Sequence, residues 1–250
     1  MDITRYIEHL AREGELLADT AERAGFDAKV HTCPDWKVRN LLRHIGMVHR
    51  WVTVLVVEKH TSYHPGEGEP DLDGAPLLDW YREGHDRLVA ALTEAPDALK
   101  CWTFLPAPSP TGFWARRQAH ETTVHRVDAE SALGPVAARS PVGPDLAADG
   151  IDELLCGFHG RDRSRVRTDR PGTLRVRTTD TGDVWTVRLS ADAPRTTRAA
   201  DGPADCELSG PAEALYLSLW NRLPAGSPDV TVTGDDRLAR LWRETSAVTW

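Results

Sequence analysis

Apolar residues recur with a helical period through the first half of the chain. Between residues 3 and 24 they fall three and four positions apart, which indicates an amphipathic helix. A second helix is expected soon after Pro34, because the residue before a proline is disfavoured in the α region, and its apolar face spans residues 38–55. Similar faces predict helices from near residue 76 to 92 and from about residue 113 to 131. Four helices of about 20 residues joined by loops are the pattern of a four-helix bundle.

The second half of the chain has a different pattern. Residues 140–144 hold two prolines and a glycine and predict a linker, and a helix is expected over residues 146–158. Residues 173–178 and 185–189 alternate around the turn sequence of residues 180–183, which is typical of a β-hairpin. The remaining expected elements are a strand at 206–209, a helix at 211–221, a strand at 230–232 and a helix at 237–244.

These two patterns predict a protein of two domains. A chain of 250 residues is long enough to bury a sizeable core without disulfides or a structural metal. We expect a two-domain α+β protein. Its first domain is a four-helix bundle over residues 1–138, and its second is an α/β domain with a small, mainly antiparallel sheet over residues 139–250.

Charge and composition exclude some classes of partner. Acidic residues outnumber basic ones by 38 to 30, and this net charge of −8 argues against binding to nucleic acid. The longest apolar candidate, residues 51–57, is far shorter than the roughly 18 residues of a membrane span. The chain start lacks the apolar segment of a signal peptide, and the four scattered cysteines form no CxxC pair. We therefore expect a cytoplasmic protein with reduced thiols that binds neither nucleic acid nor membrane.

The strongest candidate for chemistry lies in the fourth predicted helix. Glu121 and His125 are four residues apart, so both side chains project from one face and can reach one metal ion at about 2.0–2.2 Å. Asp128 lies on the same stripe and could accept a hydrogen bond from a ligand. His120 points about 100° away, and its spacing of five residues from His125 excludes the HExxH pattern of zinc proteases.

A third ligand must come from another helix. His44 is the best candidate, because it lies within the apolar stripe of the second predicted helix. His49 is five residues further on, about 140° around the helix, and is expected to face away. Two histidines and one glutamate would leave positions open for water or substrate, which is typical of a catalytic metal site.

Ordinary structural roles explain the same residues without a metal. A Glu-x-x-x-His pair on a helix is usually a solvated contact between neighbouring turns. A single histidine on an apolar face, such as His44, is more often a core residue whose hydrogen bonds are satisfied within the protein. The spacing alone leaves both interpretations open.

Several segments resemble the mycothiol-dependent maleylpyruvate isomerase family. Residues 36–45 with residues 48–51 resemble its first signature, and residues 119–129 resemble its second. The resemblance implies a DinB-like metal-binding bundle, followed by a C-terminal domain similar to sterol-carrier-protein-2-like folds. The segments that resemble this C-terminal domain are residues 148–155, 217–222 and 232–235.

The resemblance also implies a ligand set and a cosubstrate. In this family a divalent metal, usually zinc, is held by the histidine of the first signature and the glutamate and histidine of the second. These correspond here to His44, Glu121 and His125. The family further implies mycothiol as a thiol cosubstrate, with its sulfur at the open metal position.

The C-terminal domain of the family is thought to contribute an arginine that binds an anionic group of the substrate. Arg222 is the nearest match in this chain. An ion pair with Asp235 or Asp236 is the ordinary structural alternative for this arginine. Asn221 stands where the family more often has glycine, which predicts a substrate pocket different from that of the isomerase.

The expected activity is metal-dependent activation of a thiol for addition to a small, electrophilic, anionic substrate. The product chemistry would make the protein an S-transferase or, if bond rotation and elimination follow addition, a cis-trans isomerase. One alternative is a metal-dependent hydrolase that uses metal-bound water and needs no added thiol. Another is a non-catalytic protein that binds an apolar ligand in its second domain. The chain is expected to be a monomer or a weak homodimer.

Overall fold

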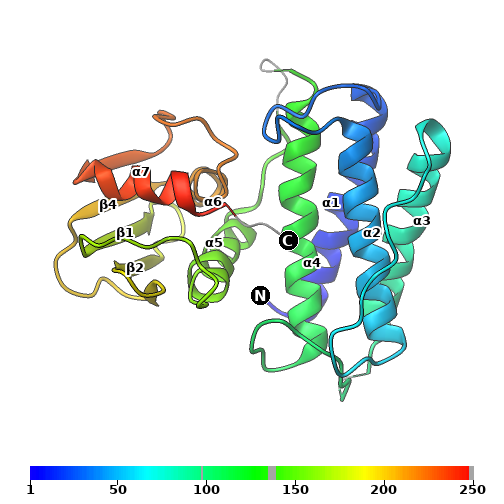
Figure 1. The fold of residues 1–250 in the computed structure, drawn as a ribbon, viewed down its shortest axis with the longest axis horizontal. Helices are drawn as coiled ribbons and strands as arrows, with labels where there is room; N and C mark the ends of the chain where they lie inside the picture. Colours follow the sequence, from blue (N-terminus) through cyan, green and yellow to red (C-terminus); the bar gives the residue numbers. More distant parts are fainter. Residues whose placement is uncertain (97, 135–138, 248–250) are drawn as a thin grey trace. The chain divides into compact units, whose positions relative to one another are not determined.

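A computed structural model describes residues 1–96, 98–134 and 139–247 and divides the chain into two compact units, Met1–Ser140 and Pro141–Trp250. Figure 1 shows that the first unit is helical and that the second combines helices with a sheet. The α+β class predicted from the sequence is confirmed. The domain boundary expected after residue 138 falls at residues 135–138, which lie outside the described residues.

Unit 1 is a bundle of four helices. Helix α1 packs mainly against α4, and α2 packs mainly against α3 (Figure 1). The four long helices expected from the apolar periodicity are therefore present, and the loops between them carry most of the prolines of this unit. The four helices are α1 (Ile3–Ala24), α2 (Val38–Val57), α3 (Gly74–Thr93) and α4 (Pro110–Ser131).

Side-chain caps set where two of these helices begin. The Asp73 carboxylate accepts a hydrogen bond from the Gly74 backbone at 2.8 Å, so α3 begins two residues before the position expected from its apolar face. The Ser109 hydroxyl accepts one from the Gly112 backbone at 3.0 Å, and Pro110 occupies the first position of α4. Helix α4 consequently begins three residues earlier than expected.

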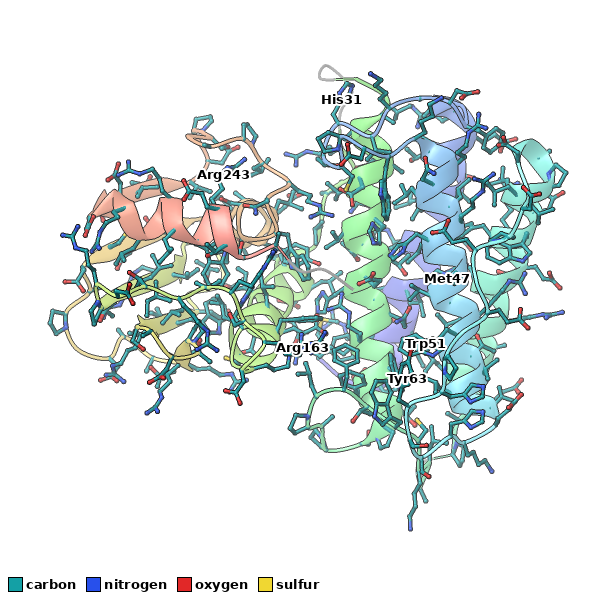
Figure 2. The ribbon with its side chains drawn as sticks, in the orientation of Figure 1. His31, Met47, Trp51, Tyr63, Arg163 and Arg243 are labelled. Atoms are coloured by element: carbon teal, nitrogen blue, oxygen red, sulfur yellow. The ribbon has the colours of Figure 1, made fainter. Side chains whose placement is uncertain are left out.

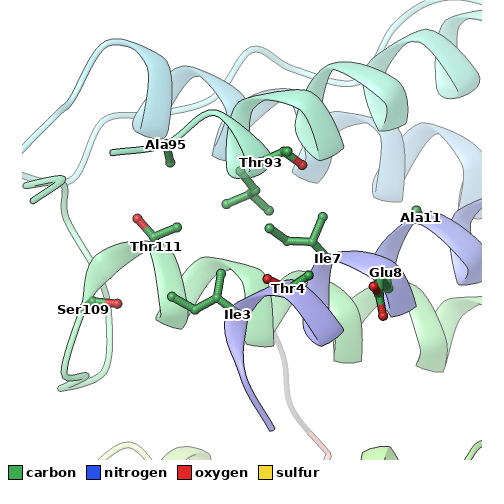
Figure 3. Close-up of a pocket in the computed structure, with 10 residues that line it drawn as sticks. Ile3, Thr4, Ile7, Glu8, Ala11, Thr93, Ala95, Ser109 and Thr111 are labelled. Atoms are coloured by element: carbon green, nitrogen blue, oxygen red, sulfur yellow. The ribbon is translucent and has the colours of Figure 1, made fainter. Parts of the chain in front are cut away.

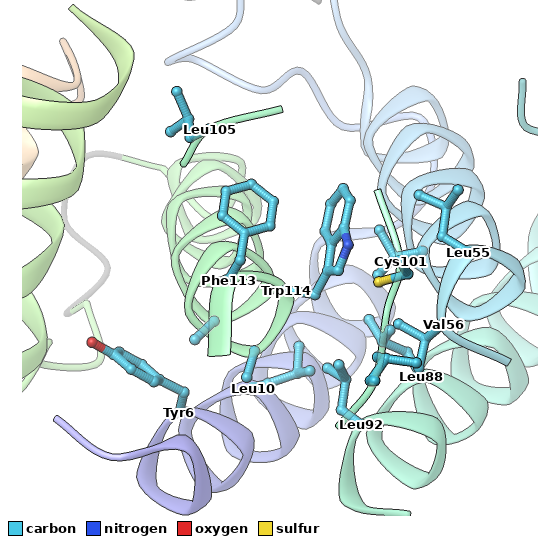
Figure 4. Packing of buried hydrophobic residues seen from close by; sticks show 14 residues of the cluster. Tyr6, Leu10, Leu55, Val56, Leu88, Leu92, Cys101, Leu105, Phe113 and Trp114 are labelled. Carbon is cyan, nitrogen blue, oxygen red and sulfur yellow. The ribbon is translucent and has the colours of Figure 1, made fainter. Parts of the chain in front are cut away.

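The core of unit 1 is aromatic at one end. Figure 4 shows the rings of Phe113 and Trp114, from α4, among side chains of the other helices such as Leu10, Leu55 and Leu88. The two rings lie 4.8 Å apart in an edge-on arrangement, which is a favourable geometry for aromatic pairs. A second buried cluster surrounds the first half of α2 and fixes that helix in place. It includes Leu17, Val38, Leu41, Leu42, Ile45, Leu77 and Tyr81.

Helix α4 is not amphipathic, and that expectation is wrong. Eighteen of its 22 residues are buried, including the charged side chains of Arg117, Glu121 and Arg126. Buried charges are stable only when paired, and Arg126 meets this condition. Its Nε donates to Glu13 at 2.7 Å and its Nη1 donates to Glu130 at 2.8 Å. The polar side chains of α4 therefore reflect internal ion pairs rather than a solvent-facing side.

Unit 2 is built on a five-stranded mixed sheet with the order β3-β2-β1-β4-β5. Strands β1 and β2 form the expected hairpin, β1 and β4 are parallel, and the other neighbouring pairs are antiparallel. The short edge strand β3 was not expected from the sequence, because three residues are too few to show an alternating pattern. The strands are β1 (Gly172–Thr178), β2 (Val184–Leu189), β3 (Arg195–Thr197), β4 (Cys206–Gly210) and β5 (Thr231–Gly234).

The helices of unit 2 differ in part from those expected. The single helix predicted over residues 146–158 is an α-helix, α5 (Pro144–Asp152), followed by a π-helix, η1 (Glu153–Phe158). Helix α6 (Ala212–Leu219) precedes the candidate Arg222, and α7 (Asp236–Thr245) follows β5. No helix among the described residues has both the length and the apolar character needed to span a membrane.

Candidate metal centre

Two helices bring the three proposed ligands together inside unit 1. His44 comes from α2, and Glu121 and His125 come from adjacent turns of α4. One ligand atom from each residue lies within 4.8 Å of the other two, and all three residues are buried. We call these residues the His–Glu–His cluster. Their burial argues against a solvated contact on the surface of a helix.

The distances in the cluster suit a tetrahedral metal. Glu121 Oε1 lies 3.7 Å from His44 Nε2 and 3.3 Å from His125 Nε2. Two ligands of a tetrahedral zinc ion lie about 3.3–3.6 Å apart when each is 2.0–2.2 Å from the metal. Within the described residues, neither His44 Nε2 nor Glu121 Oε1 has a hydrogen-bond partner, although both are buried. A cation between them would satisfy both atoms, so the residues present fit a divalent metal.

A carboxylate fixes the orientation of His125. Asp128 Oδ2 lies 3.0 Å from His125 Nδ1, as the position of Asp128 on the same stripe predicted. The other oxygen, Oδ1, accepts a hydrogen bond of 2.6 Å from the Thr32 hydroxyl, in the loop between α1 and α2. In the neutral ring this contact favours a proton on Nδ1, so the lone pair of Nε2 is directed at the cluster, which is the tautomer that a metal ligand needs.

Electrostatics favour a positive charge inside the cluster. Burial alone would lower the pKa of His125, but the carboxylates of Asp128 and Glu121 raise it to about 9. Burial would likewise raise the pKa of Glu121, but the imidazoles of His125 and His44 and the Arg117 guanidinium hold it well below its ordinary value. The cluster therefore keeps an ionised carboxylate, and a metal competes with one proton for the same place.

Two further residues contact the cluster, and the sequence reasoning missed both. Arg117 Nη2 donates to Glu121 Oε2 at 3.0 Å, and its place four residues before Glu121 could have revealed it. The half-buried ring of Trp36 lies 5.1 Å from the His44 ring and 6.1 Å from the His125 ring, measured between centroids. Trp36 precedes α2, where no periodic pattern marks a residue that contacts a site.

His49 is not part of the His–Glu–His cluster, as its direction on α2 predicted. It is nevertheless fully buried, and its Nε2 lies 2.9 Å from the Thr122 hydroxyl on α4. Burial, together with the neighbouring His85, holds the pKa of His49 well below its ordinary value, so this histidine is neutral in the core. His120 is also buried and is not part of the His–Glu–His cluster, as its direction on the helix predicted.

The aromatic end of unit 1 lies further along α2 than the cluster. Figure 2 shows His31, in the loop before α2, at one end of unit 1, and Trp51 and Tyr63 toward the other end. The Trp51 and Tyr63 rings lie 6.4 Å apart. Because His44 lies near the start of α2, the cluster is close to the loop that carries Thr32 and Trp36.

Unit 1 also has a surface pocket of about 680 Å³ between the start of α1, the end of α3 and the start of α4. Figure 3 shows the side chains of Ile3, Ile7, Thr93 and Thr111 around it. The described residues that line this pocket include no member of the His–Glu–His cluster. Apolar and hydroxyl side chains line it, together with the Glu8 carboxylate.

Arg222 lies in unit 2, just after α6, and is half-buried. Its Nη1 donates to the backbone carbonyl of residue 220 at 2.8 Å. The two aspartates considered as ion-pair partners, Asp235 and Asp236, form ion pairs with the α7 arginines Arg237 and Arg240. The role of Arg222 toward an anionic substrate stays a prediction.

The backbone explains the asparagine at position 221. Asn221 has a φ of 62°, in the left-handed region that glycine and asparagine adopt more readily than other residues. Its side-chain amide also donates to the Arg243 carbonyl at 3.0 Å. Asparagine can therefore adopt the backbone conformation of the more usual glycine, and a substrate pocket different from that of the isomerase stays a prediction.

The chain combines a helical bundle, which holds the His–Glu–His cluster in its interior, with a mixed α/β unit. This arrangement defines a two-domain protein with a candidate metal centre. The model of the mycothiol maleylpyruvate isomerase N-terminal domain matches residues 7–130, and the model of the C-terminal domain of the same family matches residues 145–241. The chain therefore belongs to the mycothiol maleylpyruvate isomerase family. No curated protein sequence is similar enough to count as a match.

Solved structures show the same fold. The crystal structure of the mycothiol-dependent maleylpyruvate isomerase is similar over 93% of both chains, with a TM-score of 0.63 and 13% identity. A histidine-to-alanine mutant of that enzyme is similar over 93% of both chains, with a TM-score of 0.64 and 14% identity. At this level of identity the likeness concerns the fold.

Proposed function

We propose that this protein is a metal-dependent enzyme that activates mycothiol for addition to a small, electrophilic, anionic substrate. His44, Glu121 and His125 would hold one divalent metal, most simply zinc, because two imidazoles and a carboxylate are a common catalytic zinc set. Family membership supports mycothiol as the thiol. We place the enzyme in the cytoplasm, as a monomer or weak homodimer, with small molecules as its partners.

The observation that carries this proposal is the geometry of the buried cluster. Its carboxylate-to-imidazole distances, 3.3 and 3.7 Å, are close to those of ligands around one small cation, and two of its polar atoms lack hydrogen bonds within the described residues. A buried polar group without a partner costs roughly 1–3 kcal/mol. A cation bound between the two atoms would remove this cost.

A comparison of thiol ionisation with reactant positioning indicates where the rate enhancement must come from. A bound divalent metal supplies a Lewis acid that favours the ionised form of a thiol. A free thiol is only about 3% ionised at pH 7, so full ionisation raises the thiolate concentration about 30-fold. The lower basicity of the bound thiolate reduces its nucleophilicity about tenfold. Ionisation therefore contributes only a few-fold. Residues that hold thiol and electrophile together must contribute most, since effective molarities can reach about 10⁵ M or more.

The chain's own residues would carry out that positioning. Asp128 keeps a proton on His125 Nδ1 and fixes the ring, with Thr32 holding the other carboxylate oxygen. Trp36 lies against both histidine rings and would limit water around them. Arg222 would bind the anionic group of the substrate through its planar fork of donors.

Two reaction outcomes are compatible with this arrangement. Addition of the thiol to an activated double bond, rotation about the resulting single bond and elimination of the same thiol would give a cis-trans isomerase. Addition without elimination would give an S-transferase. The two differ in whether the thiol is consumed, and a quantitative thiol assay over the course of the reaction distinguishes them.

Elemental analysis combined with a thiol-dependence assay tests the proposal. We expect about one divalent metal per chain and turnover of small electrophilic carboxylates only when mycothiol is present. Turnover without any added thiol would favour the metal-dependent hydrolase. A purified protein without metal, with an apolar molecule bound in unit 2, would favour the non-catalytic binding protein.

A further inference from the structure

The two carboxylate oxygens of Glu121 have different surroundings. Oε2 accepts a hydrogen bond of 3.0 Å from Arg117 Nη2, one turn earlier on α4. Oε1 lies between the His44 and His125 imidazoles and has no hydrogen-bond partner among the described residues. The Arg117 and Glu121 side chains are only 1% and 5% exposed, so water does not compete for this ion pair. The guanidinium occupies one oxygen, and the other points at the metal position.

A second pair on the same helix shows what a purely structural glutamate looks like. Arg126 and Glu130 have the same spacing, and Arg126 Nη1 donates to Glu130 Oε2 at 2.8 Å. The remaining oxygen of Glu130, Oε1, accepts a hydrogen bond of 3.0 Å from the Ser140 backbone. Both oxygens of Glu130 thus accept hydrogen bonds within the protein, whereas the corresponding oxygen of Glu121 faces the two imidazoles of the His–Glu–His cluster.

We propose that Arg117 is a positioning residue that restricts Glu121 to one metal-binding oxygen. A carboxylate can bind a zinc ion through one oxygen or through both, and a second bound oxygen would take the position that an incoming thiol needs. The Arg117 hydrogen bond removes Oε2 from that competition and fixes the plane of the carboxylate. This inference rests on the proposed function, because it concerns the position that the thiol would occupy.

A simpler role would be charge neutralisation. Arg117 would then stabilise the fold by pairing a buried carboxylate, with no influence on how the metal is bound. The two roles differ in a measurable property. Only the positioning role changes the coordination of a bound metal when Arg117 is replaced.

Cobalt reports that coordination directly. The full chain and the variants Arg117→Gln and Arg117→Lys would be loaded with Co²⁺, and visible absorption would be recorded before and during titration with mycothiol. Arg117→Gln removes the charge, and Arg117→Lys keeps it while losing the planar fork. Arg126→Lys is the matched control, because it perturbs the structural pair of the same helix. Far-ultraviolet circular dichroism confirms that each variant is folded.

We expect weaker visible bands in Arg117→Gln, because a freed carboxylate adds a second oxygen and raises the coordination number. The mycothiol concentration at half-saturation should rise about tenfold or more, the usual effect of losing a partner that orients a ligand. The cobalt bands and the half-saturating mycothiol concentration of Arg117→Lys should lie between those of the wild type and Arg117→Gln. If Arg117→Gln does not fold, Arg117→Lys is used for the test instead. Arg126→Lys should lose thermal stability with an unchanged cobalt spectrum.

Two results would overturn the inference, and they are distinguishable. If the wild type binds cobalt and mycothiol and the folded Arg117 variants give the same spectrum and the same titration, Arg117 only neutralises charge. If the wild type itself binds no cobalt, the proposed function fails, and the role of Arg117 fails with it.

Discussion

Asp128 and His125 lie on adjacent turns of α4, with Asp128 Oδ2 3.0 Å from His125 Nδ1. The Asp128 carboxylate also accepts a hydrogen bond from the Thr32 hydroxyl, so it connects the loop before α2 with one proposed metal ligand. The contact determines which ring nitrogen carries the proton. In the neutral ring His125 Nε2 can then bind a cation beside Glu121.

Replacing Asp128 with Asn should weaken metal binding about 10–100-fold, because the neutral amide no longer favours a proton on His125 Nδ1. The matched control is Thr32→Val, which removes only the hydroxyl bonded to the other oxygen and should have a smaller effect. Competition with a chelator of known affinity measures both changes. Equal affinities in wild type and Asp128→Asn would show that this contact does not support the metal.

Replacing His125 with Ala should abolish stoichiometric metal binding while leaving the helices folded, because unit 1 has its own apolar core. His120→Ala is the matched control, since His120 is a buried histidine of the same helix outside the His–Glu–His cluster. Elemental analysis and circular dichroism check both variants. Full metal content in folded His125→Ala would remove this residue from the ligand set.

Metal affinity should depend on pH through His125. Its pKa is raised to about 9 in the absence of metal, and a metal binds only the neutral ring. The apparent dissociation constant should therefore fall about tenfold for each unit of pH rise below pH 9 and level off above it. A dissociation constant that does not change between pH 6.5 and 8.5 would contradict this coupling.

The stability of the metal-free protein should show the opposite trend. Because the folded pKa of His125, about 9, exceeds the unfolded value, its protonation stabilises the fold fully below about pH 6.5, and this contribution is lost as the pH rises through 9. The loss is at most about 3 kcal/mol. Chemical denaturation of metal-free wild type and His125→Gln at pH 6 and pH 9.5 measures it. The wild type should lose stability between these pH values, and the variant should lose much less.

Replacing Arg222 with Lys should reduce turnover of a carboxylate substrate while metal content stays the same, because lysine cannot reproduce a bidentate contact. Arg243→Lys is a suitable control, since Arg243 lies in the same unit and donates to the Leu223 carbonyl at 2.9 Å. Steady-state kinetics on substrates with and without the carboxylate separate binding from a general loss of stability. Unchanged kinetics in Arg222→Ala would assign this arginine a structural role.

The sequence predicted the parts of this protein that depend on periodicity. The four helices of unit 1, the hairpin of unit 2 and the spacing of Glu121 and His125 all follow from local pattern. His44 was predictable because it lies within an apolar stripe, and a polar residue there needs a partner in the core.

The rest depends on tertiary contacts that no local pattern records. Helix α4 carries so many polar residues that the burial of eighteen of its 22 residues could not be expected, since it depends in part on distant partners such as Glu13 for Arg126. The burial of His49 could not be expected for the same reason, because its partner, Thr122, lies on another helix. Trp36 and Thr32 contact the centre from a loop, and loop conformation follows from the packing around it.

Titration of the Co²⁺-loaded wild-type protein with mycothiol tests the central claim most directly. Among the described residues no cysteine joins the His–Glu–His cluster, so the protein alone should give visible cobalt bands without a sulfur-to-metal charge-transfer band in the near ultraviolet. That band should appear on addition of mycothiol, at a pH below that needed to ionise the free thiol, because the metal competes with the thiol proton. A spectrum indifferent to mycothiol while turnover persists would contradict the claim and favour the metal-dependent hydrolase.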